Sequence, residues 1–324
     1  MRILVRLPNW LGDMVMAVAF IENLQQAYPG AAVSVIAKKG VHELLPYFPP
    51  LEHHFVYDKP ASPGLRGLWR FGRGIRDTAR FDLFFSLPDS LSSAIMGYAT
   101  AACHRIGFRK EGRGVLLTHT YSRPHGTHRV HEYLTLLEDY ASWHAHNRQV
   151  KLHHSFPRRE HVVVNINSEA QSRRLTVSKS VEILSALRAA TDAPLALIGS
   201  PKEQEFVTEV LGLLPDARNI QNIAGATTLG GLVEILASAR VVLTTDSGPA
   251  HLANALGTPT VVLFGAGNEN NTSPYNKATS TVIRLNELTC EPCLKNRCVC
   301  YETPQCLERL NTALIIQQVQ QVLS

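Results

Sequence analysis

Two successive series of alternating strands and helices constrain this chain's fold more than any other feature. In each series, short apolar runs alternate with longer amphipathic stretches. Such alternation is typical of a parallel sheet wrapped by helices. The polar segment 147–159, which lacks helical periodicity, separates the two series and is interpreted as a linker. The sequence therefore predicts the α/β fold class, with two Rossmann-like domains facing a cleft.

The predicted elements follow from the apolar pattern. Strands are expected in the first series at 3–7, 33–37, 54–57, 83–86 and 105–108, and in the second at 162–165, 195–198, 241–244 and 260–264. Helices are expected at 14–28, 65–78, 90–100 and 129–143, and then at 177–190, 203–214, 229–237 and 249–256. The predicted domains are 1–155 and 156–311, followed by a C-terminal helix over 312–324 that could pack back on the first domain.

Charge and hydropathy argue against a nucleic-acid-binding protein and against a membrane-spanning one. The chain has 324 residues and a formal charge of +5, which is too weak a charge to indicate nucleic-acid binding. No apolar run is long enough to cross a bilayer, and the first ten residues resemble a strand rather than a signal peptide, so a cytosolic location is expected. Basic residues gather in two stretches of the first half, at 66, 70, 73, 76 and 80 and at 105, 109, 110 and 113. They suit an anionic partner such as a phosphorylated lipid surface, although simple solubility explains the total charge equally well.

The first motif that carries chemistry is Pro8-Asn9-Trp10-Leu11-Gly12-Asp13, which lies between the first strand and a helix. Ligands of open α/β sheets bind at the carboxyl ends of strands. Gly12 would let the turn pass close to a ligand. Asp13 has two interpretations: a carboxylate that caps the helix, or a general base that takes a proton from an attacking sugar hydroxyl.

The second motif, Asp246-Ser247-Gly248-Pro249-Ala250-His251, follows a buried strand and opens a helix. Asp246 and Ser247 are good cap residues, and the amides that follow would make a seat for a diphosphate. His251 would add a hydrogen bond or positive charge there, or else is a satisfied histidine beside the core. A weaker third motif runs from Asn167 to Arg174 and includes Ser168 and Arg173, which suit a phosphate contact.

Metal sites are not expected. The chain has no Asp-x-Asp pair for a divalent ion, no P-loop and no Gly-x-Gly-x-x-Gly after a strand. The histidines at 125, 128 and 131 with Glu132 are compatible with a metal site, but a solvent-facing helix start is favoured. Five cysteines lie close together, at 290, 293, 298, 300 and 306. Their spacing is not that of a standard zinc site, and a loop of reduced thiols is favoured over metal.

At these residues the chain resembles glycosyltransferase family 9, the ADP-heptose:lipopolysaccharide heptosyltransferases. The resemblance spans nearly the whole chain. It rests on the segments Arg6 to Met16, Leu87 to Ser90, Arg105 to Phe108, Asp246 to His251, Ala255 to Pro259, Leu263 to Gly265 and the cysteine loop. The Asn9-Trp10 pair and that loop are similar to the heptosyltransferase II branch.

The resemblance implies a GT-B fold, with the acceptor on the N-terminal domain and the ADP-sugar on the C-terminal one. It implies direct displacement with inversion, without cofactor or nucleotide-bound metal. Asp13 matches the catalytic base. Ser247, Gly248 and His251, with Asp246 nearby, match sugar-diphosphate contacts, as Asn9, Trp10 and Gly12 match the opening motif. Arg173 stands where the family has a phosphate-binding lysine, and Glu203 lies near a glutamate associated with the nucleoside. The family's Asn-Pro-Gly is absent before Ser168, so this stretch departs from the pattern.

The implied function is transfer of L-glycero-D-manno-heptose from ADP-heptose to the lipopolysaccharide inner core, with heptose I as acceptor. Its implied partners are the Kdo/heptose-lipid A acceptor and the cytoplasmic face of the inner membrane, with peripheral attachment and no nucleic acid. Three alternatives stay open at this point: a family member that adds the first or third heptose, a nucleotide-sugar epimerase of similar layout, and a non-catalytic nucleotide-sugar-binding protein.

Overall fold

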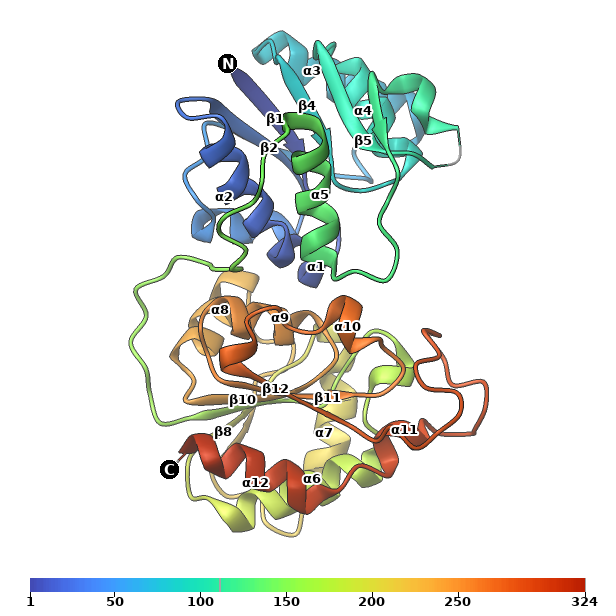
Figure 1. Cartoon of the computed structure of the whole chain (residues 1–324). Helices are drawn as coiled ribbons and strands as arrows, with labels where there is room; N and C mark the ends of the chain where they lie inside the picture. The colour runs from blue at the N-terminus through green and yellow to red at the C-terminus, as the bar shows by residue number, and fades with distance from the viewer. Residues whose placement is uncertain (111, 324) are drawn as a thin grey trace. The chain divides into compact units, whose positions relative to one another are not determined.

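The computed structural model describes residues 1–110 and 112–323. The chain divides into two compact units, Met1–His153 and His154–Ser324, and the division lies inside the polar segment 147–159 (Figure 1). Each unit contains a six-stranded sheet in which every strand pairs in parallel with its neighbours. In both sheets the first strand pairs with the second and the fourth, which is the Rossmann strand order. The predicted α/β class is confirmed.

The first unit places helices on both faces of its sheet. Its strands are β1 (Arg2–Arg6), β2 (Ala32–Lys38), β3 (His54–Tyr57), β4 (Leu83–Ser86), β5 (His104–Phe108) and β6 (His119–Tyr121). Its helices are α1 (Leu11–Met16), α2 (Val18–Ala27), α3 (Gly64–Thr78), α4 (Leu91–Ala99) and α5 (Arg129–Ala141), with 3₁₀ turns η1 (Val41–Tyr47) and η2 (Arg113–Leu116). Successive strand residues point to opposite faces. Phe84 accordingly joins the cluster that includes α3 and α4, whereas the Phe85 ring lies 5.4 Å from Phe20 of α2.

The second unit repeats this plan. Its strands are β7 (Val162–Asn165), β8 (Leu195–Leu197), β9 (Ile220–Asn222), β10 (Val241–Thr245), β11 (Thr260–Phe264) and β12 (Ser280–Arg284). Its helices are α6 (Val177–Ala190), α7 (Gln204–Gly212), α8 (Leu229–Ser238), α9 (Gly248–Ala255), α10 (Glu269–Thr272), α11 (Gln305–Glu308) and α12 (Thr312–Leu323), with 3₁₀ turns η3 (Gln171–Arg173), η4 (Pro201–Glu203) and η5 (Lys277–Thr279). The central strands β7, β10 and β11 are buried along their whole length, because helices cover both faces of a parallel sheet.

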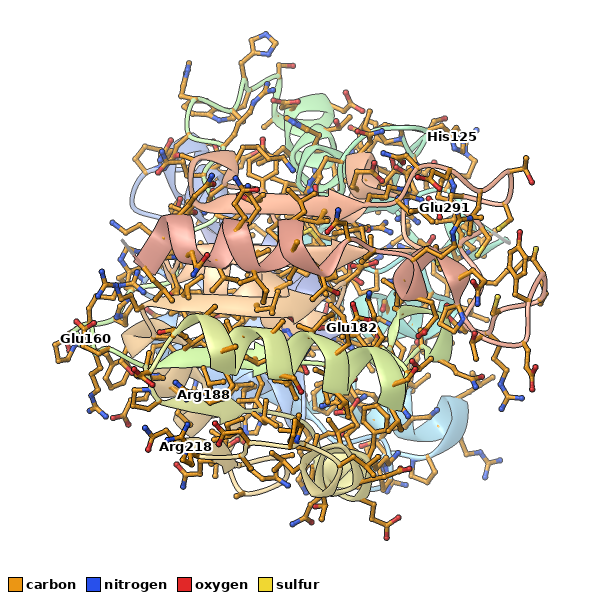
Figure 2. The ribbon with its side chains drawn as sticks, turned by 90° about the horizontal axis from the view of Figure 1, so that it is seen from below. His125, Glu160, Glu182, Arg188, Arg218 and Glu291 are labelled. Atoms are coloured by element: carbon orange, nitrogen blue, oxygen red, sulfur yellow. The ribbon has the colours of Figure 1, made fainter. Side chains whose placement is uncertain are left out.

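The C-terminal helix lies elsewhere than expected. We expected that residues 312–324 could pack back on the first domain, but α12 packs on α6, β10 and β11 of the second unit. Figure 2 shows α12 beside α6, which carries Glu182. Ile315, Ile316 and Val319 of α12 are buried in the core of the second unit. Lys179 of α6 joins the pair, because its Nζ donates to Oγ1 of Thr312, the first residue of α12, at 3.0 Å.

Most predicted elements are found within a residue or two of their expected bounds, but the sequence missed the strands β6, β9 and β12. The helix expected at 14–28 is two helices, α1 and α2, which meet at Ala17. Among residues 1–110 and 112–323, no helix has both the length and the apolar character needed to cross a membrane.

The packing of α4 on the sheet yields a stability prediction. A Cβ on Gly97 would lie 2.2 Å from the buried Phe84 ring, so Gly97→Ala forces the helix or the ring to move. We expect a loss of about 1–3 kcal/mol in the free energy of unfolding, measured by urea denaturation. Gly74→Ala on α3 is the control, since nothing lies within 4 Å of its Cβ. Equal stability of Gly97→Ala and the wild type would contradict this packing.

Candidate active-site residues in the two units

In the first unit, Asp13 lies in the first turn of α1, the first helix after β1. The N-cap position belongs to Trp10, and no side chain caps the helix. The interpretation of Asp13 as a helix cap is therefore wrong. The carboxylate instead forms an ion pair with Arg129 of α5, with Arg129 Nε 3.4 Å from Asp13 Oδ1.

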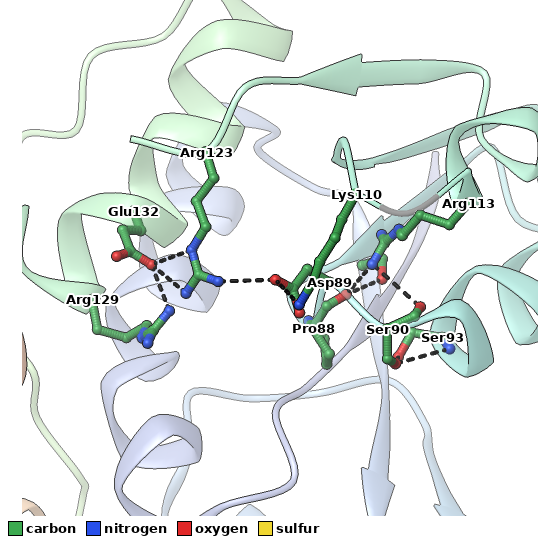
Figure 3. Close-up of polar contacts among 10 residues, drawn as sticks. Pro88, Asp89, Ser90, Ser93, Lys110, Arg113, Arg123, Arg129 and Glu132 are labelled. Atoms are coloured by element: carbon green, nitrogen blue, oxygen red, sulfur yellow. Dashed lines mark hydrogen bonds and ion pairs between the residues drawn. The ribbon is translucent and has the colours of Figure 1, made fainter. Parts of the chain in front are cut away.

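A chain of charged groups continues from Arg129 across the first unit (Figure 3). Arg129 donates to Glu132 at 2.6 Å, and Arg123 donates to the same Glu132 oxygen at 2.7 Å. Arg123 also donates to Asp89 at 2.9 Å, and Lys110 donates to Asp89 at 3.2 Å. Asp89 follows β4, the neighbour of β1 in the sheet. The cations and carboxylates alternate, so each carboxylate in this network faces a positive charge.

The protonation of Asp13 reflects a balance between burial and these charges. Burial raises the pKa of the Asp13 carboxyl above its usual value; the Arg129 charge opposes the rise and the Glu132 charge adds to it. The side chain keeps 27% of its surface exposed. An accessible carboxylate with a raised pKa, held in place by a guanidinium, has the properties of a general base.

Asn9 and Trp10 of the opening motif contact side chains of β1 and β2. The Asn9 side-chain oxygen accepts a hydrogen bond from the buried Arg6, whose Nη1 donates to the Ile36 carbonyl at 3.2 Å. The Trp10 ring is 62% exposed and has the Lys38 ammonium 5.9 Å from its centroid. Gly12 is the second residue of α1 and has helical backbone.

The histidine-rich segment begins α5. His128 is the N-cap residue, and its Nδ1 accepts a hydrogen bond from the Val130 amide at 3.2 Å. The expected helix start is present, and it faces solvent only in part: His125 is exposed and His131 is half-buried, whereas His128 and Glu132 are buried.

In the second unit, the polar side chains gather where β7 and β10 end side by side. Asn165 pairs in register with Thr244, and its amide donates to Ser247 Oγ at 2.8 Å. Ser247 Oγ donates to the Thr245 carbonyl at 3.1 Å. Ser247 occupies the N-cap position of α9 but makes no side-chain cap bond, so the capping role expected of Asp246 and Ser247 is wrong. Gly248 is the first residue of α9.

Asp246 is buried beside this helix end, with 3% of its surface exposed. Its Oδ2 lies 3.2 Å from Nη1 of Arg173, which comes from η3. Burial raises the pKa of Asp246 to about 6, against the lowering effect of Arg173 and Arg284. The carboxylate fits only because residue 267 is glycine: a Cβ there would lie 2.1 Å from Asp246 Oδ2.

Arg284 of β12 was not predicted as a site residue. Its guanidinium donates to the carbonyls of Gly267 at 2.8 Å and Gly265 at 2.9 Å, and it forms ion pairs with Glu269 and Glu291. It thereby holds the loop that makes room for Asp246. No local signal could have identified it, because β12 itself was not recognised in the sequence.

The remaining predicted residues have the following places. Ser168 is buried, and its carbonyl accepts from Arg174 at 3.1 Å. Glu203 closes a capping box, in which it accepts from the Ser200 amide at 2.7 Å. His251 is buried within α9. The structure thus brings Arg173, Asp246, Ser247 and Gly248 together at one helix end, whereas Glu203 is engaged at the start of α7.

Known proteins share this architecture and sequence. Residues 68–303 match the profile of glycosyltransferase family 9 (heptosyltransferase). The chain belongs to this family. Lipooligosaccharide heptosyltransferase 2 of Haemophilus ducreyi is 27% identical over 323 residues, covering 88% of this chain and 89% of that protein. Lipopolysaccharide heptosyltransferase 2 of Escherichia coli is 26% identical, covering 88% of each chain.

A solved structure has the same fold as this chain. The structure of E. coli ADP-heptose lipopolysaccharide heptosyltransferase II covers 100% of this chain and 98% of its own, with a TM-score of 0.84 and 24% identity. The predicted GT-B fold and the resemblance to the heptosyltransferase II branch are confirmed. The chain is therefore a glycosyltransferase of the heptosyltransferase family.

The cysteine loop of this family 9 enzyme holds free thiols. Burial raises the pKa of the Cys306 thiol to about 12. Burial and a hydrogen bond with Cys300 raise the pKa of Cys290. Within the described parts of the chain, no three histidine, cysteine or acidic side chains are placed to hold a metal ion together.

The Asp13–Arg129 pair yields a titration prediction. Because the Arg129 charge lowers the pKa of Asp13, Arg129→Gln should raise it. Carboxyl carbon chemical shifts followed by NMR over a pH series measure this pKa directly. Arg148→Gln, which removes an exposed arginine paired with Glu138, is the matched control and should leave Asp13 unchanged. An Asp13 titration unaffected by Arg129→Gln would contradict the ion pair.

Asp246 makes stability depend on pH. Its folded-state pKa of about 6 lies above the ordinary 3.8, so the folded protein binds this proton more tightly than the unfolded chain does. The stabilisation is complete below pH 4 and is lost as pH rises through 6, at a cost of about 3 kcal/mol. Asp246→Asn should remove this loss, measured as unfolding free energy between pH 4 and 7. Asp77→Asn, a substitution at an exposed position, should leave the loss of stability unchanged. Parallel pH profiles of Asp246→Asn and the wild type would refute the raised pKa of Asp246.

Proposed function

We propose that this enzyme transfers L-glycero-D-manno-heptose from ADP-heptose to heptose I of the lipopolysaccharide inner core, with inversion at the anomeric carbon. The two relatives named heptosyltransferase 2 support this choice of acceptor, and the name of the E. coli structure supports the choice of donor. The observation that carries the proposal is Asp13: a partly exposed carboxylate after β1, with a raised pKa, paired with Arg129.

In this proposal the first unit binds the acceptor. Asp13 takes the proton of the acceptor hydroxyl as that oxygen bonds to the anomeric carbon of heptose. The bond from the anomeric carbon to the ADP oxygen breaks at the same time, and ADP leaves as the anion. Trp10 offers an exposed ring on which a sugar can stack, and Asn9, held by Arg6, offers an amide to its hydroxyls. Gly12 keeps the backbone beside Asp13 free of a side chain.

The second unit binds ADP-heptose. The amides of Ser247 and Gly248, at the start of α9, lie at the positive end of the helix dipole and seat the diphosphate. Gly248 opens that helix and leaves the amides accessible. His251 and Arg173 stabilise the negative charge that develops on the leaving group. Arg173 also neutralises Asp246, which would otherwise repel a diphosphate.

Two further residues belong to the donor proposal. Glu203 uses one carboxylate oxygen in its capping box and has the other for a nucleoside hydroxyl. Ser168 follows β7 near Asn165 and supports the segment that leads to Arg173. The enzyme acts, in this proposal, at the cytoplasmic face of the inner membrane, where it meets the lipid-borne acceptor.

Asp13→Asn tests the base. The variant keeps the side-chain shape but cannot accept the proton, so turnover should fall by about 10²- to 10⁴-fold. ADP affinity, measured by calorimetry, should stay unchanged because the nucleotide binds the second unit. Asp77→Asn, an exposed substitution on α3, should retain full turnover. Normal turnover in Asp13→Asn would sink the assignment.

The acceptor is tested with purified protein, ADP-heptose and core acceptors of defined length. ADP release should require an acceptor that ends in the first heptose. Release with a Kdo-terminated acceptor would identify a first-heptose enzyme, and release only after two heptoses a third-heptose enzyme. Conversion of ADP-heptose without any acceptor would contradict the transfer itself.

A further inference from the structure

Helix α3 and its neighbour α4 expose large apolar side chains that proteins usually bury. Leu65 and Trp69 of α3 are 65% and 45% exposed, and Tyr98 of α4 is 43% exposed. Bulky side chains that gather in one exposed patch mark interaction surfaces, whereas scattered ones need no explanation. The question is whether these three side chains form one patch.

The contacts show that they do. The Trp69 and Tyr98 rings lie 5.7 Å apart, and Leu65 precedes Trp69 by one helical turn. The Arg105 guanidinium lies 5.3 Å from the Tyr98 ring centroid. Arg105 Nε also donates at 2.9 Å to a carbonyl of η2, the turn in which Val115 is 86% exposed. The apolar groups of α3, α4 and η2 therefore adjoin one another.

Unpaired positive charge accompanies this patch. Helix α3 carries four exposed arginines against a single acid, Asp77. Within residues 1–110 and 112–323, none of the four forms an ion pair or a hydrogen bond to another group, in contrast to the paired arginines near Asp13. We name as the α3–α4 surface the residues Leu65, Trp69 and Tyr98 with Arg66, Arg70, Arg73 and Arg76.

We propose that the α3–α4 surface docks this enzyme on an anionic lipid bilayer. The inference deepens the proposed function, on which it rests for the membrane-borne acceptor. Tryptophan and tyrosine favour the bilayer interface, where the ring is half buried and its polar edge stays hydrated. The guanidinium groups on the same helix as Trp69 can bind lipid phosphates with charge-assisted hydrogen bonds. One surface thus supplies both interactions that interfacial binding needs.

A second copy of the chain fits this surface less well. Symmetric association would bring the same patch of each copy together, so the unpaired arginines of one copy would face those of the other. Like charges brought together in this way oppose association. A bilayer that contains anionic lipid instead offers complementary charge over the whole surface.

Vesicle cosedimentation without any acceptor tests the electrostatic part. The vesicles are phosphatidylcholine, with or without roughly 30% phosphatidylglycerol, and only the anionic ones should bind the protein strongly. The combined change Arg70→Gln, Arg73→Gln and Arg76→Gln should weaken the partition by about 100-fold, since each cation contributes roughly fivefold. The matched control, Arg2→Gln, Lys295→Gln and Arg297→Gln, removes the same charge from other exposed positions and should lose far less.

Trp69 reports on the apolar part. Brominated lipids should quench the tryptophan fluorescence of the wild type, and Trp69→Phe should remove most of that quenching. Quenching that persists in Trp69→Phe would overturn the docking geometry. Equal binding to neutral vesicles, or an equal loss in both triple variants, would overturn the proposal, as would binding that requires the acceptor glycolipid in the vesicle. Concentration-dependent dimerisation that the α3 triple variant abolishes would show that a second copy covers the surface instead.

Failure here and failure of the proposed function are distinguishable. With a water-soluble, deacylated acceptor, the α3 triple variant should transfer heptose at the wild-type rate while failing to bind vesicles. Loss of transfer to that soluble acceptor would show that the arginines serve the reaction rather than the membrane. Vesicle binding by a protein that transfers no heptose would sink the proposed function alone.

Discussion

The pairing of the first strand with the fourth in each sheet is the constraint on which the candidate sites depend. β1 pairs with β4 and β7 pairs with β10, in parallel, so segments that lie far apart in the sequence end at the same edge. In the first unit this pairing brings the loop that leads to Asp13 next to the loop that carries Asp89. In the second unit it sets Asn165 beside the segment of Asp246 and Ser247. Ligands of open α/β sheets bind at such points, because the strand order reverses there and leaves space above the sheet.

In each unit, a candidate site carboxylate near that edge is balanced by an arginine from a different element. Asp13 is paired with Arg129 of α5, and Asp246 with Arg173 of η3. Desolvation exceeds the attraction at both sites, which is why both pKa values lie above the usual range. The difference lies in access: Asp13 keeps about a quarter of its side chain exposed, whereas Asp246 is enclosed. The Asp13 carboxylate is therefore open to solvent, and the Asp246 carboxylate is not.

The arginines of the chain serve contrasting purposes. Arg6, Arg129, Arg173 and Arg284 are held by carbonyls or carboxylates and fix loops around the two carboxylates. The arginines of α3 have no such partners among residues 1–110 and 112–323, and the same helix carries the exposed Trp69 ring. The charge of the chain is therefore unevenly distributed. The paired arginines hold the candidate sites in shape, whereas the arginines of α3 are available to an external anion.

The sequence by itself determined the α/β class, the central strands and the segments that carry chemistry. The reason is that buried parallel strands are continuous apolar runs and that their polar ends interrupt the pattern locally, as at β10 and Asp246. The edge strands β6, β9 and β12 are only partly buried, so they lack a continuous apolar run, and each pairs with one neighbouring strand. Tertiary structure alone decided that Asp13 pairs with Arg129 rather than capping α1, that Arg284 holds the Gly267 loop, and that α12 packs on α6. Each of these contacts joins segments far apart in the chain, and a local pattern carries no signal for a partner that only the fold brings close.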